Sequence, residues 1–135
     1  MSQLFSTKGR YALRFMVDLA MHPGWVSLGD VSQRQDISRK YLEQVSSVLV
    51  KAGFLQSRRG KAGGYQLARN PEEYTLKEIL EVADGSISPV GCIGCSQDQD
   101  CPRAADCHTR PVWQDLGEIT ETYLASRTLA DLIGA

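Results

Sequence analysis

Several features that define other classes of protein are missing from this sequence of 135 residues. It contains no run of about eighteen apolar residues, so it offers no membrane-spanning helix. The segment from Met1 to Arg14 lacks the apolar stretch of a secretory signal peptide. We therefore expect a cytoplasmic protein with no membrane partner.

The sequence also has little that would support catalysis. It holds only two histidines, His22 and His108, and they form no pattern typical of a catalytic triad. It has no glycine-rich loop that ends in Lys followed by Ser or Thr, which is the pattern that cradles nucleotide phosphates. We therefore predict that the protein is not an enzyme.

Positive charge is scarce in the second half of the chain. Residues 71–135 contain 4 Lys and Arg against 12 Asp and Glu, whereas residues 1–70 contain 11 Lys and Arg against 4 Asp and Glu. The formal net charge of −1 hides this division. A basic half joined to an acidic half predicts that only the first half binds a polyanion.

The order of secondary-structure elements predicts a winged helix-turn-helix. Apolar spacing and Ser or Thr caps predict a helix that ends at Met21, a second that starts at Ser27 and a third over 39–52. Residues 54–57 and 65–67 are predicted strands of a hairpin, and a fourth helix starts at Thr75. The predicted fold is mostly α with a small β-hairpin wing, and it ends in a long C-terminal dimerisation helix.

We predict two parts. Residues 1–75 form a winged helix-turn-helix DNA-binding domain, and residues 76–135 hold a cluster-binding loop and the dimerisation helices. In the last long helix, Val112, Leu116, Ile119 and Tyr123 recur at the spacing of a coiled-coil seam. They are the predicted interface of a homodimer.

The predicted DNA surface combines the third helix with the hairpin. In the major groove, Arg pairs with guanine and Gln with adenine. The Glu43 carboxylate accepts a hydrogen bond from cytosine and repels phosphate, so we predict that Glu43 is a specificity gate that excludes many DNA sequences. The glycine-rich hairpin tip carries cations that suit a narrow minor groove, and its glycines allow a close backbone approach to phosphate. The predicted contacts to double-stranded DNA are Ser38, Arg39, Tyr41, Glu43, Gln44, Arg58, Arg59, Gly60, Lys61, Gly63, Gly64 and Tyr65. Lys8 and Arg10 are predicted to contact the phosphate backbone of the DNA. A polar helix face alone is usually just solvated, and it is the order of elements that favours DNA binding.

All four cysteines lie within sixteen residues, as Cys92, Cys95, Cys101 and Cys107, with His108 directly after the last. Their neighbours are Gly, Ser, Asp and Pro, which is loop composition rather than core composition. Zinc ribbons usually carry two separated Cys-x2-Cys pairs, and only Cys92 and Cys95 have that form. The spacing therefore favours an iron–sulfur cluster over zinc, with a thiol–disulfide switch as the third alternative.

The chain resembles the IscR-type iron–sulfur cluster regulators in residues 6–13, 38–69, the cysteine loop and 112–116. The resemblance implies a homodimer that binds DNA through the third helix and the wing. It also implies a [2Fe–2S] cluster near the long helix, with [4Fe–4S] or Zn as alternatives. The implied function is a repressor that senses cluster status and controls iron–sulfur cluster assembly genes.

One ligand departs from the pattern of that family. Cys95, Cys101 and Cys107 match its three cysteines, but Arg110 occupies the position of its histidine, and a guanidinium stays protonated. The fourth ligand is then Cys92 or His108, and the short spacing to Cys95 favours Cys92. Some relatives that sense nitric oxide draw a ligand from an aspartate near the N-terminus; this chain has Lys8 there, which argues against that ligand scheme. A redox- or nitric oxide-sensing regulator and a zinc-stabilised interaction module remain alternatives.

Overall fold

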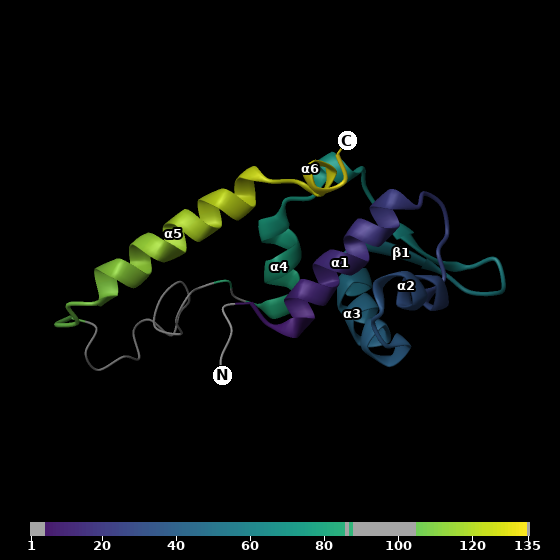
Figure 1. Cartoon of the computed structure of the whole chain (residues 1–135), viewed down its shortest axis with the longest axis horizontal. Helices are drawn as coiled ribbons and strands as arrows, with labels where there is room; N and C mark the ends of the chain where they lie inside the picture. Colours follow the sequence, from purple (N-terminus) through teal and green to yellow (C-terminus); the bar gives the residue numbers. More distant parts are fainter. Residues whose placement is uncertain (1–4, 86, 88–104, 135) are drawn as a thin grey trace.

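The computed structural model describes residues 5–85, 87 and 105–134. Figure 1 shows a group of short helices with a projecting hairpin at one end and a long helix at the other. The elements are α1 Thr7–Met21, α2 Leu28–Gln35, α3 Arg39–Lys51, β1 Leu55–Arg58, β2 Gly64–Leu67, the 3-10 helix η1 Pro71–Glu73, α4 Leu76–Asp84, α5 Arg110–Ser126 and α6 Leu129–Leu132. This order confirms the predicted fold, and the strands differ from the prediction by one residue at their ends.

Hydroxyl caps explain where the helices begin. The side chain at each N-cap accepts a hydrogen bond from the backbone N–H three residues later, which satisfies a donor that the helix cannot satisfy itself. The capping residues are Ser6, Ser27, Ser38, Thr75 and Thr128. Ser27 and Thr75 are the two residues at which the sequence predicted that α2 and α4 start.

The core forms around α1. Ala12, Phe15 and Met16 of α1 are fully buried and pack with Leu42 and Leu49 of α3. Such close packing of apolar side chains is the main source of stability in a domain of this size.

Buried Tyr74 joins the wing to this core. Its hydroxyl donates to the carbonyl oxygen of Phe54 at 2.7 Å and accepts from the backbone N–H groups of Ala68 and Arg69. Both ends of the hairpin are thereby tied to the segment that leads into α4.

The C-terminal elements return to the winged half of the chain. Leu129 of α6 is fully buried in the core, and its N–H donates to the carbonyl oxygen of Tyr74. Leu124 of α5 packs with Leu76 and Leu80 of α4. The rest of α5 extends away from the other elements (Figure 1). A boundary at residue 75 remains a prediction, because α4 and α6 share packing with α1. No helix in the described part of the chain is long and apolar enough to cross a membrane.

Candidate nucleic-acid interface

A tight turn connects α2 to α3. Asp36 has a left-handed backbone with φ of 55°, a conformation that Asp and Asn tolerate better than most residues. The hydroxyl of Ser32 donates to the carbonyl oxygen of Ile37 at 2.6 Å, and Ser38 then caps α3. This is the turn of a helix-turn-helix.

A buried carboxylate fixes the end of α2 against α1. Asp18 is 1% exposed and accepts hydrogen bonds from the Arg34 guanidinium and from the Gln35 amide, whose nitrogen lies 3.1 Å away. Burial is the largest single influence and raises the pKa of Asp18. The hydrogen bonds from Arg34 and Gln35, with the charges of Arg34 and His22, outweigh it and hold the pKa below its ordinary value.

The outer face of α3 is polar and open to solvent, as predicted. Its exposed side chains are Arg39, Lys40, Glu43, Gln44 and Ser47. Tyr41 differs, because it is half-buried and meets the ring of Tyr11 edge-on at 5.2 Å. Tyr41 therefore has a packing role, and base contacts by the exposed residues remain a prediction.

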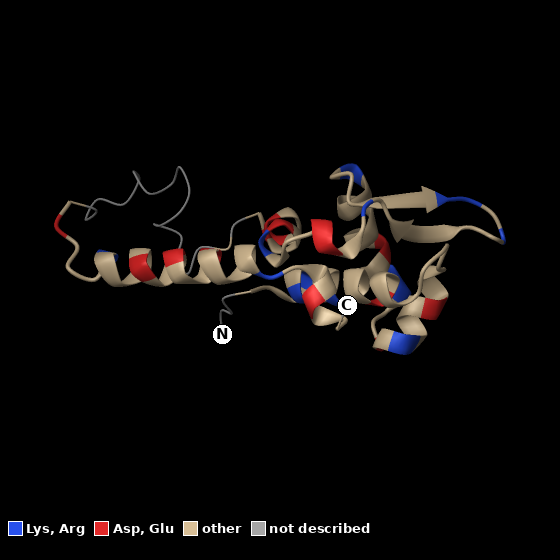
Figure 2. Ribbon diagram, turned by 90° about the horizontal axis from the view of Figure 1, so that it is seen from above, with Lys and Arg blue, Asp and Glu red and all other residues tan. Residues whose placement is uncertain are grey.

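The wing tip carries exposed cations. Arg58, Arg59 and Lys61 are exposed, and in Figure 2 the blue of Lys and Arg colours the ribbon at the far end of the hairpin. The guanidinium of Arg58 lies over the ring of Trp25, 5.6 Å from its centre. Arg58 is thus anchored at the end of β1, beside the wing tip.

At two positions of the wing, close backbone contacts that the sequence did not show require glycine. A Cβ at Gly63 would collide with the carbonyl oxygen of Arg58, and one at Gly64 with that of Val26. The close approach that these glycines permit is therefore to the protein's own backbone. Tyr65 has a packing role too, since its ring meets Phe15 edge-on and its hydroxyl lies 3.4 Å from Ser46 Oγ.

Lys8 and Arg10 lie in the first turn of α1, which packs on α4. The wing extends from the opposite end of the winged half (Figure 1). Lys8 is exposed, and the guanidinium of Arg10 donates to Thr7 Oγ1 at 3.3 Å. Contact of these two residues with the DNA backbone also remains a prediction.

Two candidate cluster ligands lie just before α5. Cys107 is half-buried with its Sγ 3.3 Å from Thr109 Oγ1, and His108 is exposed. The other predicted ligands, Cys92, Cys95 and Cys101, lie outside the described residues. Within residues 5–85, 87 and 105–134, no three His, Cys, Asp or Glu side chains come together as a metal site.

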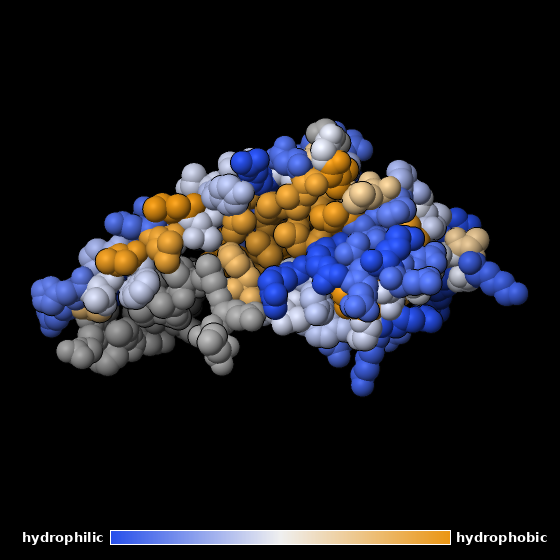
Figure 3. All heavy atoms as spheres, in the orientation of Figure 1, coloured by the Kyte–Doolittle hydropathy of each residue, from blue (hydrophilic) through white to orange (hydrophobic). Residues whose placement is uncertain are grey.

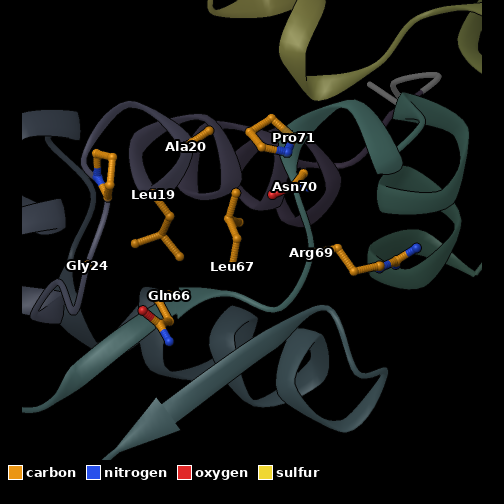
Figure 4. A pocket seen from close by; sticks show the side chains of 9 residues that line it. Leu19, Ala20, Gly24, Gln66, Leu67, Arg69, Asn70 and Pro71 are labelled. Carbon is orange, nitrogen blue, oxygen red and sulfur yellow. The ribbon is translucent and has the colours of Figure 1, made fainter.

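A shallow cavity of about 330 Å³ lies behind the wing (Figure 4). Leu19 and Ala20 of α1 face Gln66 and Leu67 of β2 across it. Arg69, at its edge, stacks on the rings of Phe54 and Tyr74 at 5.0 and 4.4 Å. Arg69 is the one charged residue among the described residues of this lining, so the cavity has no acid–base pair of the kind that a catalytic site needs.

Sequence reasoning missed Trp25 and the pair formed by Asp18 and Arg34. Trp25 stands in the connection between α1 and α2, where nothing local marks it as a partner of the wing. Asp18 carries one weak signal, because it is a charged residue between apolar positions of α1, where an unpaired charge is costly.

A polar helix after a tight turn, with a basic hairpin beside it, defines a winged helix-turn-helix DNA-binding protein. The chain belongs to the Rrf2 family, described as iron-dependent transcriptional regulators, which it matches over residues 5–135. It is therefore a DNA-binding transcriptional regulator and not an enzyme.

The chain is similar to several known proteins. It is 39% identical to the protein rrf2 of Nitratidesulfovibrio vulgaris over 95% of this chain and 85% of that protein. CymR, the global cysteine regulator of B. subtilis, is 37% identical in sequence to this chain. Its structure superposes with a TM-score of 0.79 over 99% of this chain and 98% of CymR. The structure of T. potens IscR is 37% identical with a TM-score of 0.76, covering 96% and 85% of the two chains.

Proposed function

We propose that this regulator binds an iron–sulfur cluster through its cysteine segment and represses iron–sulfur cluster assembly genes according to cluster status. The observation that carries the proposal is the placement of Cys95, Cys101 and Cys107 with five residues between neighbours, the last of them just before α5. Similarity to a protein named IscR supports it.

The chemistry of the donor set fits a cluster. Cysteine thiolates are the usual ligands of [2Fe–2S] and [4Fe–4S] clusters, and histidine substitutes in some. Cys95, Cys101 and Cys107 would hold the cluster with Cys92 or His108 as fourth ligand. When bound, the cluster supplies a group whose presence depends on iron supply and redox conditions. Zn is the alternative occupant of the same thiolates.

The described residues contribute the DNA surface. Arg39, Glu43 and Gln44 stand exposed on α3 and are suited to base edges, while the wing cations are suited to the minor groove and phosphates. The ion pair between Asp18 and Arg34 holds the α2–α3 unit on α1, so the exposed face of α3 keeps a fixed direction.

The proposal includes a homodimer formed through α5. Four large apolar side chains on this helix face solvent, which is unusual for a stable monomer. Their exposed fractions are 58% for Val112, 40% for Leu116, 66% for Ile119 and 54% for Tyr123.

A second apolar surface lies on the same side of the molecule. A groove of about 370 Å³ runs between α1, α4 and α5, and its apolar walls are Phe5, Leu13, Leu80 and Leu124. Figure 3 shows apolar atoms both on α5 and over the α1–α4 region. A two-fold dimer that pairs these surfaces would bury both.

Anaerobic purification tests the proposed function. An iron–sulfur protein is red-brown, absorbs visible light and contains equal iron and sulfide, whereas a zinc protein is colourless. DNA binding is then measured with and without the cluster, and Cys95→Ala serves as the cluster-free control. A colourless protein with bound zinc would contradict cluster binding.

A second candidate follows from the similarity to CymR. In this alternative the protein responds to thiol chemistry without a cluster, as one of the cysteine regulators. Metal-free protein whose DNA binding changes on mild oxidation, and recovers on reduction, would support it over the cluster.

A further inference from the structure

The starting observation is a contact between two segments that are far apart in the chain. Trp25 lies in the connection between α1 and α2, and Arg58 is the last residue of β1. The Arg58 guanidinium carbon lies 5.6 Å from the centre of the Trp25 ring. Trp25 is half-buried, so one side of its ring is available to the arginine.

The backbone holds Trp25 in that place. The neighbouring Val26 makes a bridge to Tyr65 of β2 through two hydrogen bonds, at 2.9 Å and 2.8 Å. Ser57, next to Arg58, pairs with Tyr65 across the hairpin. Near the wing tip, three backbone segments therefore lie side by side, and Trp25 and Arg58 project from the outer two.

The stack leaves the arginine able to bind a second group. The ring face of Trp25 is no conventional hydrogen-bond acceptor, so the N–H groups of the Arg58 guanidinium remain donors for phosphate oxygens. Within the described residues, no hydrogen bond, ion pair or ring contact holds the side chains of Arg59 and Lys61. In this wing, Arg58 is the cation whose direction the fold sets.

We propose that Trp25 is a positioning residue for DNA recognition that acts through Arg58. By holding the guanidinium beside the wing tip, Trp25 lowers the ordering cost that a long flexible side chain incurs on binding phosphate. The inference rests on the proposed contact between the wing and DNA, and it adds a residue outside both the recognition helix and the wing.

A double-mutant cycle tests this role. The variants are Trp25→Met, Arg58→Gln and the double variant, and the probe is a labelled duplex selected by the wild-type protein from a random pool. Arg58→Gln should weaken binding roughly tenfold, the usual value of one charge-assisted hydrogen bond. Trp25→Met should weaken binding about two- to fivefold in the wild type and not at all in Arg58→Gln, while Trp25→Phe, which keeps a ring, should recover part of the loss.

Two outcomes overturn the inference, and they are distinguishable. If Arg58→Gln binds as tightly as wild type, both the wing contact and the role of Trp25 are wrong. If Arg58→Gln binds DNA more weakly but Trp25→Met lowers the affinity by the same factor with and without Arg58, the wing contact stands and Trp25 does not act through Arg58.

A fluorescence measurement keeps the test valid if Trp25→Met folds poorly. The chain has two tryptophans, so Trp113→Phe leaves Trp25 as the only reporter. Arg58→Gln should then change the emission intensity of Trp25. The matched control is Arg69→Gln, because Arg69 stacks on Phe54 and Tyr74 instead. Identical emission in the two variants would overturn the stack itself.

Discussion

Asp18 of α1 and Arg34 of α2 form a two-pronged ion pair, with Arg34 Nη2 2.7 Å from Asp18 Oδ1 and Nε 3.0 Å from Oδ2. The two partners are unequally exposed, because the Asp18 side chain is 1% exposed and that of Arg34 is 35% exposed. The pair joins the helix at the centre of the core to the helix that precedes α3. Its loss would therefore affect both stability and the direction of α3.

Replacing Arg34 should lower the free energy of unfolding more than replacing Asp18. Arg34→Met leaves a buried carboxylate without its charge partner, and we expect a loss of about 3 kcal/mol in the free energy of unfolding. Asp18→Asn keeps an oxygen acceptor, and the partly exposed Arg34 reaches water, so its loss should be smaller. Urea unfolding at one protein concentration measures both, and the reverse order would contradict the asymmetry.

The same pair predicts an acid-sensitive part of the stability. The pKa of Asp18 is below its ordinary value in the folded protein, so folding favours the ionised form. This contribution is fully present above the pKa of an unfolded Asp, about 4, and is lost as pH falls through the lower folded pKa. The difference in unfolding free energy between wild type and Asp18→Asn should be constant above about pH 5 and shrink below about pH 4. A difference that stays constant down to acid unfolding would contradict this prediction.

The wing cations should contribute to DNA affinity. Arg59→Ala should weaken binding to a selected duplex by about 1–3 kcal/mol at fixed salt if this side chain enters a groove. Lys77→Ala is the matched control, since it removes one positive charge from α4, where Lys77 pairs with Glu81. Fluorescence anisotropy measures both, and equal affinity for the two variants would argue against the wing assignment.

The exposed face of α5 should control oligomeric state. Ile119→Asp places a charge at the most exposed of the four apolar positions and should shift the protein from dimer to monomer at micromolar concentration. Gln114→Asp adds the same charge at an exposed position outside the seam and should leave the dimer intact. Sedimentation equilibrium distinguishes these masses. A wild-type protein that is already monomeric would disprove the dimer.

The fourth cluster ligand is open to a direct test. We expect Cys92→Ala to lose cluster content on anaerobic reconstitution and His108→Ala to retain it, because Cys92 lies close in sequence to Cys95. Iron analysis and the visible spectrum of each variant measure the result. The opposite pattern would assign the role to His108, and no change in either variant would move the fourth ligand outside this segment.

Local signals were enough to predict the long helices, the hairpin and their order. Ser and Thr caps, helical spacing of apolar residues and the glycine-rich hairpin depend on neighbours within a few residues, so they can be seen in the sequence. The starts of α1, α2, α3 and α4 all agree with such signals. The outward face of α3 was predictable for the same reason, because helical spacing places its polar residues together.

Sequence patterns alone thus predict a winged helix-turn-helix with a basic first half and a cysteine-rich segment before its last long helix. Which residues meet across the fold is visible in the three-dimensional structure and not in the sequence. Asp18 meets Arg34 and Trp25 meets Arg58 because packing of α1 and pairing of the wing bring distant segments together. Gly63 and Gly64 of the wing likewise lie against carbonyl groups of the chain itself. Such contacts depend on the three-dimensional path of the backbone, and no periodicity along the chain encodes them.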